Sequence, residues 1–486
     1  MNKVIRPGAN AWRVEHAERM SVIVDAEDYF RAARDAMLKA RHQILLIGWD
    51  FDARIRLADP PEEAPDAPGQ VGAFITWLAR RNPALDIHLL RWDIGGLKSI
   101  LHARTLATIT RWTLHPRIHP KLDSNHPPAA SHHQKIVVID DCLAFCGGID
   151  MTRGRWDTRA HRDDEPHRVD PDGSRYMPWH DATTALQGPI ARALGELCRE
   201  RWALAGGKPI APPPPSDACW PECLTPHFTD VPAAISRTQP ETDRVDAVHE
   251  IEQLYLDLIA RARRTIYAES QYFASRRIAE AIARRLDEED GPEIVIVNPQ
   301  AADGWLEQVA MDTARARLVE ALRRRDRHSR LRIYHPFTAA GEAIYVHAKV
   351  FVVDDTALRV GSSNFNNRSL RLDTECDVTI ECAELGDLVC TQIAAIRDDL
   401  LAEHLGCTPE EITRMIADQG SLIGAIELLR HRDGRSLRPY ETPDLDAVTV
   451  WLADNEVLDP ENPEDLFEPM SNGGLFRRLR KPWRKA

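Results

Sequence analysis

One short pattern of polar residues occurs twice in this chain of 486 residues, and it constrains the fold more than any other feature. The first copy is His133-Gln134-Lys135, followed by Asp140 and Gly147-Gly148. The second copy, about 210 residues later, is His347-Ala348-Lys349, followed by Asp354 and Gly361-Ser362. The internal spacing is the same in both copies. The repeat therefore indicates a duplicated chain with two similar halves, and the natural place for a shared site is between them.

Each copy lies in a stretch where polar and apolar residues alternate, HHQKIVVID in the first and VHAKVFVVDD in the second. Alternation of this kind predicts a β-strand, on which residues i and i+2 share a face. Each histidine is then expected beside its lysine on one face of a sheet. The apolar runs 136–139 and 350–353 would anchor the two strands in a core.

An imidazole beside an ammonium group suits the cleavage of a phosphodiester. A neutral imidazole is a nucleophile at neutral pH, and a protonated one is a general acid. A lysine supplies positive charge for phosphoryl oxygens. Two histidines on opposite sides of one phosphorus would allow one to attack while the other protonates the leaving oxygen.

The rest of the chain predicts an α/β fold made of two similar domains, each a mixed sheet flanked by helices, with the active site at their interface. Both halves contain an amphipathic helix and then a strand, at 28–39 and 43–51 in the first and at 246–263 and 265–273 in the second. Further strands are expected at 86–92 and 293–299, and His-Pro turns at 119–120 and 335–336. Alternating helices and strands favour α/β layers.

Composition shifts divide the chain into four parts. Residues 1–205 form a catalytic half with the first motif, and 206–245 read as a proline-rich linker because they contain PIAPPPPSD. Residues 246–405 form the half with the second motif. Residues 406–486 are expected to be a helical appendage with a basic tail, starting at the capping-box pattern Thr408-x-x-Glu411.

Charge and cysteine content narrow the class of protein. The net charge of −13 argues against a dedicated nucleic-acid binder. The nine cysteines are odd in number and form no CxxC pair, which predicts no disulfide framework and a reducing compartment. Cys219 and Cys223 are a weak zinc pattern because no second pair matches them. No signal peptide or transmembrane segment is expected, so the predicted location is cytoplasmic, with visits to the inner membrane surface. The basic tail at 476–485 is either solvated or in contact with anionic lipid.

Several longer segments extend the pattern and resemble those of the phospholipase D superfamily, whose signature is a duplicated HxKxxxxD. They are FCGGIDMTRGRWDTRAH (145–161), the PWHD…GP…RW segment (178–202), IYAESQYF (266–273) and GSSNFNNRSL with the following DTE (361–375). The resemblance covers roughly residues 20–410. It is closest to the eukaryotic-type phospholipase D branch.

The resemblance implies a fold of two facing α/β domains and a ping-pong mechanism. His133 would attack phosphorus and form a phosphohistidine, and His347 would protonate the leaving alcohol and then activate water. Lys135, Lys349 and Asn364 would bind the phosphate oxygens. Asp181 is expected to orient His133, and Glu375 to orient His347. Asp140 and Asp354 belong to the catalytic signature, but their places at strand ends indicate supporting or turn roles rather than proton transfer.

The resemblance also implies a substrate, namely a glycerophospholipid cleaved at its distal phosphodiester bond to phosphatidic acid and an alcohol. Water, or a small alcohol in transphosphatidylation, would be the acceptor at a membrane surface. No cofactor or metal is expected. Trp179, Tyr272 and Phe273 are either core residues or a cation–π box for a headgroup such as choline. The alternatives are a cardiolipin synthase-type phosphatidyl transferase, a nuclease of the same superfamily, and a catalytically silent lipid-binding protein.

Overall fold

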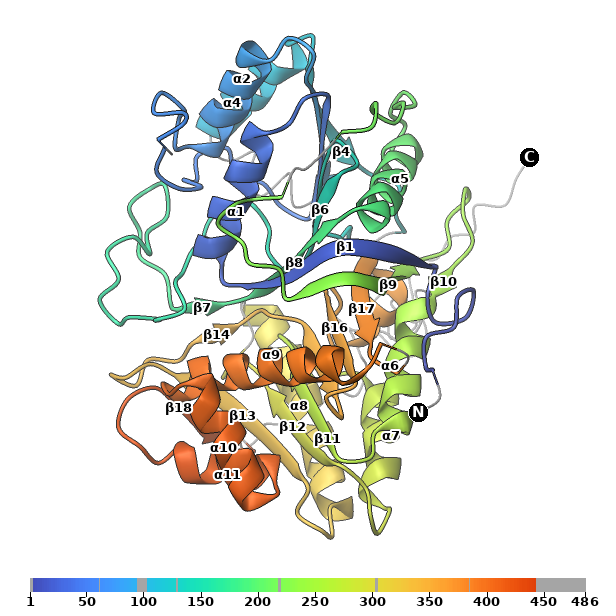
Figure 1. Cartoon of the computed structure of the whole chain (residues 1–486), viewed down its shortest axis with the longest axis vertical. Helices are drawn as coiled ribbons and strands as arrows, with labels where there is room; N and C mark the ends of the chain where they lie inside the picture. The colour runs from blue at the N-terminus through green and yellow to red at the C-terminus, as the bar shows by residue number, and fades with distance from the viewer. Residues whose placement is uncertain are drawn as a thin grey trace, which may run out of the picture.

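The computed structural model describes residues 3–60, 62–93, 103–127, 130–216, 220–301, 305–383 and 385–442. A mixed β-sheet runs through both halves of this described chain (Figure 1). The strands of the first half are β1 (Arg13–Val24), β2 (Gln43–Gly48), β3 (Asp86–Trp92), β4 (Ile118–Asp123), β5 (Ile136–Ile139), β6 (Leu143–Gly147) and β8 (Ala182–Gln187). Those of the second are β9 (Phe228–Gln239), β10 (Val248–His249), β11 (Thr265–Glu269), β12 (Glu293–Val297), β13 (Leu331–Phe337), β15 (Val350–Val353), β16 (Ala357–Gly361), β17 (Glu375–Glu381) and β18 (Ser436–Pro439).

The strand order confirms the duplication. One half has the order β4-β3-β2-β5-β6-β8-β1, and the other has the matching order β13-β12-β11-β15-β16-β17-β9. In each half the outer strands pair in parallel and the strands around the motif pair antiparallel. The two halves join where β1 and β9 run antiparallel in the middle of the sheet (Figure 1).

Helices pack on the sheet and close three apolar cores. In the first half they are α1 (Ala26–Leu38), α2 (Val71–Arg81), α4 (Ala103–Thr113) and α5 (Pro189–Leu204). In the second they are α6 (Glu250–Arg261), α7 (Arg276–Leu286), α8 (Trp305–Arg325), the short π-helix η1 (Arg368–Leu372), α9 (Asp387–Leu405), α10 (Pro409–Gln419) and α11 (Leu422–Leu429). One core belongs to each half, and the largest spans both, with α5 and α9 packed against the central strands. Because a continuous core crosses the middle of the sheet, the two halves hold each other in place.

The predicted linker at 206–245 is wrong over much of its length. Its proline run has no regular secondary structure, but 228–239 form β9, a central strand of the sheet. Val231, Ala233 and Ile235 alternate into the core that joins the halves, which is why this segment forms a strand. By the strand correspondence β9 is the counterpart of β1, so it opens the second half of the sheet.

The predicted appendage is part of the second half. The capping box at Thr408 and Glu411 is confirmed at the start of α10. After α11, however, β18 pairs antiparallel with β13 and extends the sheet by one strand. The basic tail at 476–485 lies outside the described residues, as does Cys219 of the weak zinc pattern; Cys223 is exposed. Cys382 and Cys390 form a disulfide, a pair that the sequence analysis did not predict.

Two local predictions also need correction. The His-Pro pairs at 119–120 and 335–336 lie inside β4 and β13 rather than in turns. The motif histidines and lysines precede their strands, because β5 begins at Ile136 and β15 at Val350. The alternating pattern is therefore correct for the apolar run, while the histidine and lysine lie on an extended entry segment.

Candidate active site

The two halves exchange short backbone contacts directly beside both motif histidines. In the first contact, β7 (Trp179–His180) pairs in parallel with β14 (Tyr345–Val346), and the N–H of His347 donates to the carbonyl of His180 at 2.7 Å. The second contact mirrors it, because the N–H of His133 donates to the carbonyl of Thr374 at 2.9 Å. Each histidine is thus held against a segment of the opposite half.

The orienting carboxylates are therefore paired crosswise, and the predicted pairing is wrong. His133 Nδ1 lies 2.9 and 3.0 Å from the carboxylate oxygens of Glu375. His347 Nδ1 lies 2.6 Å from Asp181 Oδ2. The reason is the backbone exchange, since Asp181 directly follows the β7 segment that lies beside His347, and Glu375 directly follows Thr374 beside His133. Asp181 and Glu375 do each contact a motif histidine, but in both cases it is the histidine of the other half.

The carboxylates fix which ring nitrogen faces the site. With Nδ1–H donated to a carboxylate, the Nε2 lone pair of each histidine is free. Burial and the nearby charges of Lys135 and Lys349 hold the pKa of His133 well below its usual range. Burial and Lys349 lower the pKa of His347 in the same way. Both imidazoles are therefore neutral at physiological pH, which a nucleophile requires.

Lys135 and Lys349, one from each half, lie close enough for their charges to interact. Lys135 Nζ donates to the carbonyl of His133 at 2.8 Å and lies 3.3 Å from Asp150 Oδ2. Lys349 Nζ donates to the carbonyl of His347. Burial, opposed by Asp181 and reinforced by the charge of Lys135, lowers the pKa of Lys349 to about 7. Lys135 and Lys349 are both buried side chains, and two ammonium groups at one buried place favour the binding of an anion.

Glu375 is held at the centre of this group. Ser362 donates its hydroxyl to the carboxylate of Glu375. Burial raises the pKa of Glu375 to about 8, although Lys135 and Ser362 oppose that effect. Burial thus disfavours an ion pair between Glu375 and His133, and it keeps the imidazole neutral.

Asn364 in the second half corresponds to Asp150 in the first half, so an amide stands at this position on one side of the site and a carboxylate on the other. Asn364 Oδ1 accepts from the N–H of Gln271 at 3.2 Å, and Asp150 Oδ1 accepts from the N–H of Trp49 at 3.1 Å. The second oxygen of Asp150 faces Lys135. The amide nitrogen of Asn364 donates to Gln271 Oε1 at 3.4 Å, so binding of a phosphate oxygen by Asn364 stays a prediction. The sequence signal for Asp150 was its place two residues after the first glycine pair.

Asp140 and Asp354 lie at the opposite ends of β5 and β15 from the histidines. Both have positive φ, 50° and 53°, in the tight turns that lead to β6 and β16. The carboxylate of Asp140 accepts from the backbone N–H groups of residues 41–43 at 2.7–2.8 Å. Asp354 accepts in the same way from residues 263–265. The two signature aspartates therefore fasten each turn to the strand beside it.

We expect Asp140→Ala to lower stability with little effect on turnover by the folded protein. It removes the acceptor of three backbone donors, one buried and two partly buried, and charged hydrogen bonds of this kind are worth roughly 1.5–3 kcal/mol each. Because water can replace part of the bonding at the two partly buried donors, we expect a net loss of about 3 kcal/mol, which would lower Tm by several degrees, measured by circular dichroism. Asp140→Asn, which keeps one acceptor oxygen, is the control and should lose less. A fully stable Asp140→Ala protein without activity would instead assign the residue to the chemistry.

The aromatic box is not formed. Phe273 is buried against Phe365 in the core of the second half. Trp179 stacks on Tyr345 with ring centroids 4.5 Å apart, and its ring lies 5.3 Å from that of His347. The guanidinium of Arg155 lies 4.1 Å from the Trp179 ring centre. The cation that Trp179 binds is thus the protein's own Arg155, a site residue that sequence reasoning missed although it lies in the 145–161 segment.

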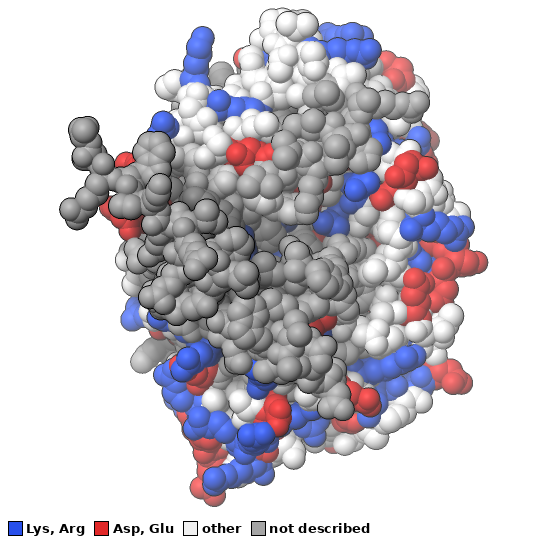
Figure 2. Space-filling model, turned by 180° about the vertical axis from the view of Figure 1, so that it is seen from behind, with Lys and Arg blue, Asp and Glu red and all other residues white. Residues whose placement is uncertain are grey.

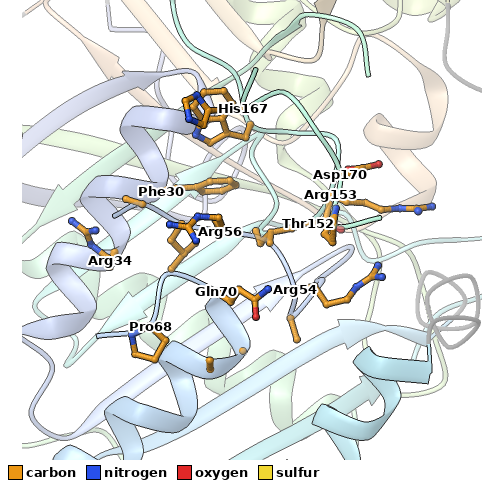
Figure 3. Close-up of a pocket in the computed structure, with 18 of the residues that line it drawn as sticks. Phe30, Arg34, Arg54, Arg56, Pro68, Gln70, Thr152, Arg153, His167 and Asp170 are labelled. Atoms are coloured by element: carbon orange, nitrogen blue, oxygen red, sulfur yellow. The ribbon is translucent and has the colours of Figure 1, made fainter. Parts of the chain in front are cut away.

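A separate cavity of about 1570 Å³ lies in the first half between α1, α2 and the loops around 53–59 and 152–176. Figure 3 shows arginines along its wall, including Arg34, Arg54, Arg56 and Arg153. None of the four motif histidines and lysines lines it. This cavity is therefore separate from the motif residues, which lie at the junction of the halves.

Comparisons with known proteins agree with this geometry. A family model described as "Phospholipase D" matches residues 36–212, and one described as "Cardiolipin synthase, PLD-like domain" matches residues 255–396. Each half of the sheet thus has its own match.

Similar full-length proteins include Phospholipase D1 of Saccharomyces cerevisiae, 25% identical over 79% of this chain and 28% of the relative. Phospholipase D alpha 1 of Carica papaya is 25% identical over 78% of this chain and 63% of the relative. The chain thus spans less than two thirds of the length of these relatives. The crystal structure of phosphatidylserine synthase from Haemophilus influenzae matches with a TM-score of 0.53 and 13% identity, over 86% of this chain and 96% of that one. At that identity the likeness is one of fold.

Proposed function

Because the chain belongs to the phospholipase D superfamily, we propose that it is a phospholipase D, which hydrolyses the distal phosphodiester bond of a glycerophospholipid to phosphatidic acid and a free alcohol. The observation that carries the proposal is the pair of motif histidines, each hydrogen-bonded at Nδ1 to a carboxylate of the opposite half. This arrangement supplies two Nε2 atoms and two ammonium groups at one place. A phosphodiester anion is the substrate that such a set fits.

In the proposed mechanism, Nε2 of His133 attacks phosphorus and the bond to the headgroup oxygen breaks. When the phosphodiester anion binds, its negative charge favours the protonated imidazole, and Nε2 of His347 takes up a proton from solvent. His347 then passes this proton to the leaving alkoxide as the general acid. His347, now neutral, removes a proton from water, and the resulting hydroxide displaces His133 from phosphorus. Lys135, Lys349 and Asn364 bind the non-bridging oxygens as negative charge builds. A small primary alcohol in place of water yields a phosphatidyl alcohol.

We infer that the protein works at a membrane surface, which phospholipid substrates require, and we propose a cytoplasmic location. Among the described residues, no helix is long and apolar enough to cross a bilayer. On the face in Figure 2, the described Lys and Arg side chains are interspersed with Asp and Glu. This mixed surface, with the net charge of −13, gives little support to the nuclease alternative.

The test is product analysis with vesicles of phosphatidylcholine and phosphatidylethanolamine in the presence of dilute ethanol. We expect phosphatidic acid together with phosphatidylethanol, because both acceptors attack the same intermediate. The His133→Ala/His347→Ala protein, prepared in parallel, controls for contaminating lipase. Absence of both products from the folded wild-type protein would contradict the proposal.

A cardiolipin synthase-type phosphatidyl transferase is the second candidate, favoured by the family model that matches 255–396. The same mechanism would then use a glyceryl hydroxyl in place of water. Vesicles of phosphatidylglycerol distinguish the two readings. Cardiolipin as the main product would favour the transferase, and phosphatidic acid would favour the phospholipase.

The depressed pKa of Lys349 predicts how activity depends on pH. Lysine binds an anion only when protonated, so kcat/KM should fall as the pH rises through the lysine pKa of about 7. Lys349→Arg should reduce the rate, because the guanidinium differs in shape, but it should move the falling limb to higher pH since arginine stays charged. Initial rates between pH 5.5 and 9 measure the falling limb in the wild type and in Lys349→Arg. An unmoved limb in the variant would assign the titration to another group.

A further inference from the structure

A second cluster of ionisable side chains lies buried between the halves, next to the active site. Asp25 at the start of α1, His161, His180 of β7 and Glu403 of α9 are each at most 4% exposed. Each offers one nitrogen or oxygen atom, and these four atoms lie within 4.8 Å of one another. Three of the residues come from the first half and Glu403 comes from the second, so the cluster spans the junction.

The distances within the cluster suit four ligands around one small cation. His161 Nε2 lies 3.4 Å from Asp25 Oδ2 and 3.1 Å from Glu403 Oε1. His180 Nδ1 lies 3.4 Å from Asp25 Oδ1 and 2.7 Å from Glu403 Oε1. Ligand atoms about 2.0–2.2 Å from a tetrahedral zinc ion are separated by roughly 3.3 Å. Only small shifts of the side chains would be needed to admit such an ion.

In both histidines, the ring nitrogen that faces away from the cluster is hydrogen-bonded to a further carboxylate, as is typical of metal-binding histidines. His161 Nδ1 lies 3.0 Å from Asp157 Oδ2, and His180 Nε2 lies 2.9 Å from Glu269 Oε2. A carboxylate on the far nitrogen fixes the tautomer and leaves the near nitrogen with its lone pair facing the cluster. The same arrangement occurs at both imidazoles.

Asp25 and Glu403 also accept hydrogen bonds from groups outside the cluster. Asp25 Oδ1 accepts from the N–H of Asp181 at 3.1 Å, and Glu403 Oε2 accepts from Arg159 at 2.6 Å. Asp25 Oδ2, however, has no hydrogen-bond donor among the described residues, although it is fully buried and faces His161. A buried carboxylate oxygen without a donor is costly, and a cation would satisfy it.

We propose that Asp25, His161, His180 and Glu403 bind one divalent transition-metal ion, with zinc as the expected metal, in a closed structural site. Structural zinc sites are closed and four-coordinate, and imidazole nitrogen and carboxylate oxygen are both zinc ligands, although most structural sites also use cysteine. The ion would hold the two halves together. It would also brace the segment that orients His347, because His180 accepts from the N–H of His347 and is followed by Asp181. The sequence predicted no metal, so this proposal departs from that prediction, and the ion takes no part in the proposed reaction.

A neighbouring trio, His180, Glu269 and His404, is a weaker candidate. Glu269 accepts from both imidazoles at 2.9 Å and also from Tyr267, so its oxygens already have donors. The trio supplies three ligands rather than four. His404 therefore provides a matched control, since it is as buried as His161 and belongs to the same network.

The test is the metal content of the full-length protein, expressed with added zinc, dialysed without chelator and measured by plasma mass spectrometry. We expect about one zinc ion per chain in the wild type and in His404→Gln. Asp25→Asn and His161→Gln should lose most of it. Asp25→Asn changes one oxygen to an amide of equal size, so it tests the site even if His161→Gln does not fold.

Two further readouts do not depend on turnover. Removing the metal with a chelator should lower the wild-type Tm, and zinc should restore it. Cobalt in place of zinc should give the intense visible bands of a tetrahedral site in the wild type and not in Asp25→Asn. A folded wild-type protein that binds no metal, with a Tm unchanged by chelator or zinc, would overturn the proposal. Metal that is lost in His404→Gln but kept in His161→Gln and Asp25→Asn would do so too.

Discussion

Replacing His133 or His347 by alanine is expected to reduce phosphodiester turnover by roughly four orders of magnitude or more. One imidazole forms the bond to phosphorus and the other moves the proton, and neither role has a substitute among the described neighbours. The two side chains act as a unit, so the double variant should be little slower than the slower single variant.

The measurement is the initial rate of phosphatidic acid release, compared at equal amounts of folded protein. His133 is partly exposed, with 15% of its side chain accessible, and His347 is buried. Each replacement removes a polar side chain rather than part of the apolar core, so the variants should keep the wild-type Tm within a few degrees. Substantial turnover by either single variant would refute the assignment of that histidine.

The second large effect concerns the carboxylates, and it tests the crosswise pairing. Glu375→Gln and Asp181→Asn should each slow turnover roughly 10²- to 10⁴-fold, because an amide no longer fixes the tautomer of its histidine. The two variants should differ in the step that they slow. Glu375 contacts His133, so its loss impairs attack on phosphorus, whereas Asp181 contacts His347, so its loss impairs proton transfer.

A phosphatidyl ester of p-nitrophenol separates these steps, since p-nitrophenolate leaves without a general acid. With this substrate, Asp181→Asn should keep a rapid burst of p-nitrophenol followed by slow turnover. Glu375→Gln should show a slow first turnover and no burst. The reverse outcome would support the same-half pairing that the sequence suggested.

Much of the fold could be predicted because the chain signals it locally. The apolar runs at 86–92 and 293–299 match β3 and β12 closely, since a short run of buried residues is a strand signal by itself. β9 was missed because a proline-rich segment precedes it, and its alternating Val231, Ala233 and Ile235 are interrupted by Pro232. Local pattern is a weak guide where a strand is selected by its neighbours in the sheet.

The sequence predicted which residues belong to the candidate site, but it did not predict which carboxylate contacts which histidine. His133, Lys135, His347 and Lys349 follow from a repeated motif, but which carboxylate reaches which histidine depends on β7 lying beside β14. That contact joins segments about 165 residues apart, and nothing in the local sequence encodes it. The same holds for the buried cluster, whose members range from Asp25 to Glu403.

We propose above that the two halves form one site in which His133 carries the phosphatidyl group. The most direct measurement is rapid acid-free quenching of Asp181→Asn mixed with the p-nitrophenyl ester carrying a labelled phosphatidyl group, followed by peptide mapping. We expect one labelled group per chain on the peptide that contains His133. The label should be lost when His133→Ala is added to the variant. Label on His347, or full turnover with no covalent adduct at any time, would contradict it.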